Sequence, residues 1–171
     1  LMQSEIRVGK ELSTAELAEL KDTAKTDKAY NQALGMIARR PRSEWEMREY
    51  LKRKEYDPEL VDELIERLYA SKWLDDRDFA QKWVDNRRLL KATSKRRLTQ
   101  ELKAKRVADD VIASVLVEDT TNEVEVLTEL IARKQKQSRY QDQQKLMAYL
   151  IRQGFNYGDI KAALENPILD E

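Results

Sequence analysis

The sequence contains one apolar pattern three times, and this repeat constrains the fold more than any other feature. The copies can be aligned on Leu51, Leu102 and Leu150, which lie 51 and 48 residues apart. In each copy the anchor is apolar, and so are the positions four residues before it and 5, 10, 13 and 14 residues after it. Self-similarity at such a period is typical of proteins built from tandem helical units. The other apolar positions are Met47, Leu98, Leu146, Tyr56, Val107, Phe155, Val61, Ile112, Ile160, Leu64, Val115, Ala163, Ile65, Leu116 and Leu164.

Each copy predicts a helix, a short turn and a second helix. Ser43, Ser94 and Asp142 precede the anchors by eight residues and are good N-caps, while Asp57 and Asn156 are placed to cap the second helices. The whole chain of 171 residues contains only 4 Gly and 3 Pro, as expected of a protein that is helical throughout.

Further apolar stripes predict helices between the copies. We expect one stripe to close the first unit: Phe79, Ala80, Trp83, Val84 and Arg87. A second stripe comprises Val124, Leu127, Leu130 and Ile131, and a third, before the first copy, comprises Tyr30, Ala33, Leu34 and Ile37. The prediction is an all-α, elongated tandem array of three-helix units. Its expected divisions are an N-terminal extension (1–26), a first unit with its preceding helix (27–91), a second unit (92–138) and a third unit (139–171).

The composition argues against several classes of chemistry. The chain has no Cys and no His, which excludes disulfides, thiol nucleophiles, Ser-His dyads and imidazole metal ligands. Its longest apolar run, residues 111–117, is far shorter than a membrane span. We therefore expect a soluble, cytoplasmic protein without a catalytic site, metal, cofactor or membrane partner.

The net charge of +0 conceals a strong alternation along the chain. Residues 87–106 carry 9 basic side chains and one acid, whereas residues 109–129 carry 7 acids and no Lys or Arg. One interpretation is a basic face that binds phosphates or an acidic protein surface. The other is an ordinary solvated surface whose acids and bases pair between helices. The candidate binding residues are Arg87, Arg88, Lys91, Lys95, Arg96, Arg97, Lys103, Lys105 and Arg106.

Two further functions receive little support from the residues. A sequence-reading helix-turn-helix protein would place its second helices in the major groove, but the exposed positions of these helices are acidic, among them Glu59, Asp62 and Asp110. An enzyme or metal site could use Asp75, Asp76 and Asp78. These carboxylates precede a helical stripe, however, and the simpler interpretation is that they cap it and complement its dipole.

The sequence resembles the RecX family of proteins that regulate the RecA recombinase. The strongest motif is Trp73-Leu74-Asp75-Asp76-Arg77-Asp78-Phe79-Ala80, in which Trp73, Leu74, Asp75, Asp76, Phe79 and Ala80 are expected to be mostly structural. Other matching pieces are Gly9-Lys10-Glu11-Leu12, Arg40-Pro41-Arg42-Ser43-Glu44, Arg97-Leu98, Glu101-Leu102 and Leu150-Ile151-Arg152-Gln153-Gly154-Phe155. The chain departs from the family at Glu55, Lys72 and Arg106, which stand where the family usually has Gly.

The resemblance implies a non-enzymatic regulator of recombination and the SOS response. Such a protein would bind the RecA–DNA filament, mainly inhibit its growth and recombinase activity, and act as a monomer. It would also contact the backbone of single-stranded or double-stranded DNA weakly. The alternative is a sequence-independent nucleic-acid-binding protein that acts without a recombinase, on the strength of residues 87–106.

Overall fold

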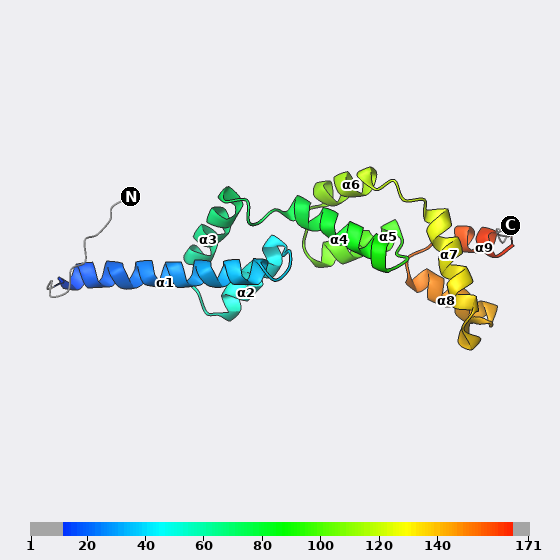
Figure 1. Cartoon of the computed structure of the whole chain (residues 1–171), viewed down its shortest axis with the longest axis horizontal. Helices are drawn as coiled ribbons and strands as arrows, with labels where there is room; N and C mark the ends of the chain where they lie inside the picture. The colour runs from blue at the N-terminus through cyan, green and yellow to red at the C-terminus, as the bar shows by residue number, and fades with distance from the viewer. Residues whose placement is uncertain (1–11, 166–171) are drawn as a thin grey trace. The chain divides into compact units, whose positions relative to one another are not determined.

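The computed structural model describes residues 12–165, and all regular structure in that range is helical. The nine α-helices in residues 12–165 confirm the all-α prediction, and Figure 1 labels them along the chain. The matching piece at Gly9, Lys10 and Glu11 lies outside the described residues. Between residues 12 and 165, every helix is too short or too polar to cross a bilayer. The helices are α1 (Thr14–Ile37), α2 (Glu44–Arg53), α3 (Pro58–Ala70), α4 (Asp76–Leu90), α5 (Lys95–Ala104), α6 (Asp109–Glu118), α7 (Glu123–Gln135), α8 (Gln143–Arg152) and α9 (Tyr157–Glu165), with a 3-10 turn η1 at Ser138–Tyr140.

The described chain divides into two compact units, the first comprising residues up to Arg40 together with Met47–Trp73. In this unit α1, α2 and α3 contribute apolar side chains that are almost completely buried. The guanidinium of Arg67 lies 3.8 Å from the ring centre of Tyr30, so α3 is also held to α1 by a cation–π contact. The buried side chains are Ala29, Ala33, Met47, Leu51, Val61, Leu64, Ile65 and Leu68.

The second unit comprises Pro41–Glu46 and the chain from Leu74 onward, and it contains two hydrophobic cores. The first core is formed by α4, α5 and α6, and the second by α7, α8 and α9. Phe79, Ala80 and Val84 of α4 pack with Leu98 and Leu102 of α5. The expectation that this stripe closes the first unit is therefore wrong, because its apolar face is buried in the core that follows it in the chain.

A serine at the start of one repeat is hydrogen-bonded to the end of the first helix in the next repeat. The Ser43 hydroxyl donates to the carbonyl of Lys105 at 3.1 Å, and the Ser94 hydroxyl donates to the carbonyl of Gln153 at 2.9 Å. Each hydroxyl also accepts the backbone N–H three residues further on, which confirms Ser43 and Ser94 as N-caps. Asp57, in contrast, makes no side-chain capping hydrogen bond at the start of α3. Both serines are almost fully buried, and we call these two contacts the serine links.

The ends of four helices require a residue in the left-handed conformation. Glu55, Lys72, Arg106 and Gly154 have φ values of 59°, 57°, 55° and 92°. In each case the following residue donates its N–H to the carbonyl five residues before it, for example Phe155 to Leu150 at 3.3 Å. The backbone at Glu55, Lys72 and Arg106 thus adopts a conformation that L-residues disfavour and that glycine accommodates without strain.

Candidate functional site

Most of the predicted basic face is paired with carboxylates. Five of the nine candidates form ion pairs, four with acids of the same unit's α5, α6 or α6–α7 connection and one with an acid of α2. The pairs are Arg87–Glu101, Arg88–Asp119, Arg97–Glu101, Lys103–Asp109 and Lys105–Glu46. Glu101 is already counted in the net charge of +8 along residues 87–106, so the three acids from outside this segment offset three of its eight net positive charges.

The pair between Arg88 and Asp119 is the most buried, with side-chain exposures of 12% and 5%. The Arg88 nitrogens lie 3.0 and 2.5 Å from one Asp119 oxygen, and Arg88 also donates to the Thr93 carbonyl. Burial acts to raise the pKa of Asp119, but hydrogen bonds from Arg88 and Thr121 outweigh it and hold the pKa below its usual range. Arg88 thus fastens the end of α4 to the connection between α6 and α7.

Glu101 is a second centre of neutralisation. Its carboxylate accepts from Arg87 Nε at 2.7 Å, from Trp83 Nε1 at 3.0 Å and from Arg97 Nε at 3.4 Å. Burial again acts to raise the pKa of Glu101, and these donors lower it overall. The Arg87 guanidinium also lies 4.6 Å from the Trp83 ring centre, so it contacts both a carboxylate and an aromatic ring.

The remaining four candidates differ in their surroundings. Lys95 Nζ donates to the Asp119 carbonyl at 2.9 Å, and the Arg106 guanidinium lies 5.8 Å from the Trp45 ring centre. Within the described part of the chain, neither Lys91 nor Arg96 forms an ion pair. Lys91 and Arg96 are therefore the cations of this block whose charge is most available to a ligand.

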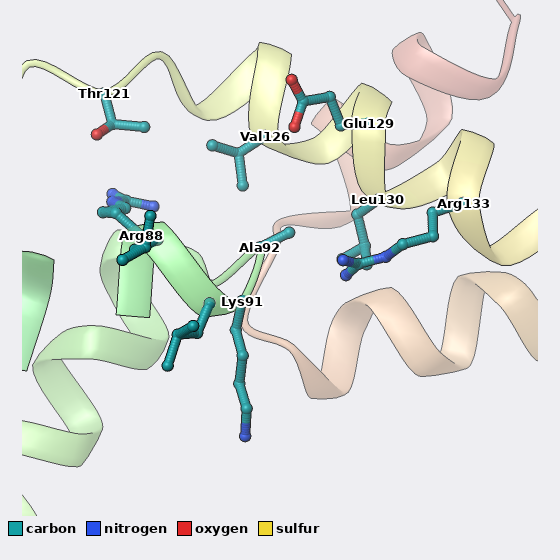
Figure 2. Close-up of a pocket in the computed structure, with 10 residues that line it drawn as sticks. Arg88, Lys91, Ala92, Thr121, Val126, Glu129, Leu130 and Arg133 are labelled. Atoms are coloured by element: carbon teal, nitrogen blue, oxygen red, sulfur yellow. The ribbon is translucent and has the colours of Figure 1, made fainter. Parts of the chain in front are cut away.

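Lys91 borders a cavity of about 200 Å³ between the end of α4 and α7. Figure 2 shows Val126 and Glu129 on α7 facing the α4 end, while Lys91 extends away from α7. Leu89 and Leu90 also line this cavity and are 82% and 64% exposed. Leu89 and Leu90 therefore leave apolar side chains exposed at the edge of this cavity. The cavity is lined by Arg88, Leu89, Leu90, Lys91, Ala92, Thr121, Val126, Glu129, Leu130 and Arg133.

Most residues of the motif at 73–80 pack in the core or cap and link helices. Leu74 is buried, and Phe79 and Ala80 lie in the core, whereas Trp73 is 55% exposed. The Asp75 side chain accepts the N–H groups of Arg77 and Asp78 and so caps α4.

The neighbouring carboxylate of Asp76 joins the start of α2 to the start of α4. It accepts the Glu44 N–H at 2.7 Å, and burial nevertheless raises the pKa of Asp76. Among residues 12–165 no group of three or more potential metal ligands occurs. Asp75 caps a helix and Asp76 links two helices, while the Asp78 carboxylate pairs with Lys82 on the same helix at 2.6 Å.

Comparison with known proteins identifies the repeats. Residues 29–68, 75–116 and 122–164 match the first, second and third three-helix domains of RecX. The chain is 32% identical over 170 residues to "Regulatory protein RecX" of Bacillus subtilis and 29% identical over 170 residues to that of Listeria welshimeri. The aligned parts cover 96% and 95% of this chain but 64% and 62% of the relatives, so the chain spans slightly less than two thirds of their length.

Solved structures share the fold. A crystal structure of regulatory protein RecX has a TM-score of 0.75 at 20% identity, with coverage of 94% of this chain and 82% of that one. RecX from Lactobacillus salivarius has a TM-score of 0.71 at 20% identity, with coverage of 84% and 96%. The three domain matches follow one another along the chain in the order first, second, third, and the curated relatives carry the same family name. The chain therefore belongs to the RecX family of regulatory proteins.

Proposed function

We propose that this protein is a non-enzymatic, cytoplasmic regulator that binds the RecA–DNA filament as a monomer and mainly inhibits filament growth and recombinase activity. The observation that carries the proposal is the match of all three domains, in order, to a family named for its regulatory role. Through the filament it would also moderate the SOS response. DNA backbone contacts would add a weaker, sequence-independent component.

The exposed leucine pair is the surface we assign to the protein part of the filament. Leu89 and Leu90 offer apolar area that is not used in either core of the second unit, and Lys91 and Arg133 border the same cavity. In protein interfaces a few side chains near the centre account for most of the binding energy. This surface would therefore contact RecA, leaving other cations to contact DNA.

The test is an inhibition assay with the cognate recombinase. RecA is assembled on single-stranded DNA, the purified chain is added, and ATP hydrolysis and filament length are followed. We expect both to decrease with rising concentration of the chain. No binding to the filament and no change in ATP hydrolysis at saturation would refute the proposal.

A matched pair of variants tests the assigned surface. Leu89→Ser with Leu90→Ser should weaken inhibition by about tenfold or more, because two exposed anchors are lost without disturbing a core. Val117→Ser is the control, since Val117 is also an aliphatic residue, 83% exposed, but does not line this cavity. Equal inhibition by the leucine variant and the control would show that RecA is bound elsewhere.

The second candidate function is sequence-independent nucleic-acid binding without a recombinase. It is favoured by Lys91 and Arg96, which retain their charge, and less by the five paired cations of the same block. Arg96→Glu separates the two functions. A nucleic-acid-binding protein would lose binding to naked DNA, whereas a filament regulator would keep part of its affinity through protein contacts.

A further inference from the structure

The third three-helix domain contains a cavity whose lining is strongly basic. It has a volume of about 240 Å³ and lies between η1 and one face of α8. Lys145, Ala148 and Arg152 share this face because they are spaced by three and four residues on the helix. The lining residues are Arg139, Tyr140, Lys145, Ala148 and Arg152, so three of the five are cations and none is an acid.

The charges of this cavity are much less neutralised than those of residues 87–106. In the described part of the chain, Arg139 and Arg152 form no ion pair. Lys145 approaches Asp142 at 3.5 Å, but that carboxylate also accepts the backbone N–H groups of Gln144 and Lys145 as the cap of α8. The cavity therefore keeps most of its positive charge.

Two tyrosine rings at this cavity contact a further cation, Lys134. The ring centres of Tyr140 and Tyr149 are 5.0 Å apart, and Lys134 Nζ lies 5.2 and 4.6 Å from them. The Arg139 guanidinium lies 5.7 Å from the Tyr140 ring centre, within the range of a cation–π contact. Residues 133–152 carry six basic side chains and one acid, so the positive charge continues beyond the cavity.

We propose that this cavity is a binding site for the phosphodiester groups of a single DNA strand, with Arg139, Lys145 and Arg152 as the phosphate-binding residues. Arginine offers a planar fork of donors that matches phosphate oxygens, and lysine adds a point charge. Cations repeated along one surface suit a ligand whose charge repeats at short intervals. The inference rests on the proposed function only in naming DNA as the source of the phosphates.

A protein segment is a poorer fit to this cavity. Ala148 is the only aliphatic residue among its five lining residues, and it offers little area for an apolar anchor. The cavity beside α4, in contrast, is lined by the exposed Leu89 and Leu90. We therefore assign the RecA protein of the filament to the cavity beside the leucines and its DNA backbone to the cavity between η1 and α8.

Binding to naked DNA tests the site without RecA. Fluorescence anisotropy of a labelled oligothymidylate is measured with the full chain over a salt series. The double variant Arg139→Glu with Arg152→Glu should bind at least tenfold more weakly. Because each lost phosphate contact removes about 0.7 from the slope of log K against log salt for single strands, two lost contacts should reduce the slope by roughly 1.4. Arg139→Lys with Arg152→Lys should retain most of the binding.

The control changes the net charge equally at sites away from the cavity. Lys82→Glu with Lys161→Glu alters two exposed lysines, on α4 and α9, and circular dichroism confirms that each variant folds. Unchanged DNA binding by the arginine double variant, or an equal loss in the control, would overturn the site. Inhibition of the RecA filament is measured with the same proteins. Lost DNA binding by the arginine double variant with some remaining inhibition supports the site. Intact DNA binding by the wild-type chain without any inhibition contradicts the proposed function alone.

Discussion

At the scale of single residues, Asp119 and its neighbour Glu118 show how burial alters the contribution of an ion pair. Asp119 is buried against Arg88, whereas Glu118 pairs with Arg77 at 2.7 Å while both side chains remain about half exposed. We expect Asp119→Asn to lower the free energy of unfolding by about 3 kcal/mol, because it leaves a buried arginine without its counter-charge. Glu118→Gln should cost less than about 1 kcal/mol. Chemical denaturation of both variants measures the difference.

The same carboxylate gives a pH dependence. Because the pKa of Asp119 is lower in the folded than in the unfolded protein, its ionised form stabilises the fold above the unfolded value of about 3.9. This stabilisation is lost as the pH falls through the lower, folded-state pKa. We expect wild-type stability to decrease below about pH 4 and the decrease to be smaller in Asp119→Asn. An equally steep decrease in the variant would assign the acid sensitivity to other groups.

Two glycines should respond to the same substitution in opposite ways. A Cβ on Gly154 would lie 2.4 Å from Ser94 Oγ, at a φ of 92°, whereas a Cβ on Gly35 would meet nothing within 4 Å. Gly154→Ala should therefore destabilise the protein by about 1–3 kcal/mol through backbone strain and a clash with the serine link. Gly35→Ala, inside α1, should stabilise it by about 0.5–1 kcal/mol. Thermal unfolding of the two variants should show shifts of opposite sign.

At the scale of the helices, the end of α3 tests the left-handed positions. Lys72 has a φ of 57°, so Lys72→Gly should raise the free energy of unfolding by up to about 1 kcal/mol. Lys54 is the control, because it also follows a helix end but is absent from the residues with positive φ. Lys54→Gly should bring no gain, since glycine only adds freedom to the unfolded chain there. Urea unfolding distinguishes these outcomes.

The existence of the helices could be predicted from the sequence, but the partner of α4 could not. The spacing of Met47 and Leu51 in α2, and of Leu64 and Leu68 in α3, reflects a local period, and local periods determine which face of a helix is apolar. The stripe at Phe79, Ala80 and Val84 has the same period whichever neighbour it packs against. Its burial with Leu98 depends on the course of the chain, which the period does not encode.

The candidate site was less predictable than the helices for a related reason. Counting charges along the chain finds nine cations in residues 87–106, but it cannot show which carboxylates approach them. Glu101 lies 14 residues from Arg87, and Asp119 lies 31 residues from Arg88. The excess of bases at residues 133–145 is visible in the sequence, and only the fold adds Arg152 to the same cavity.

At the scale of the whole molecule, the serine links couple successive repeats. Ser94→Ala removes a helix cap and a bond to Gln153 together, so the Arg97 N–H and the Gln153 carbonyl both lose this partner. We expect a loss of about 1–3 kcal/mol. Hydrogen exchange should become faster in both α5 and α8, although only one of them contains the substitution. Ser138→Ala, at an exposed serine, should leave both helices unaffected; faster exchange confined to α5 would show that the repeats are not coupled.

Both halves of a serine link belong to the repeated unit itself. The hydroxyl stands at the start of a repeat's first helix, and the carbonyl that receives it stands at the end of the equivalent helix one repeat later. A gene segment encoding such a unit, once duplicated, would already specify the contact between the original and the copy. Lengthening the array would then require no newly evolved interface, and divergence could act on the surfaces, where the leucine pair and the basic cavity now distinguish one domain from another.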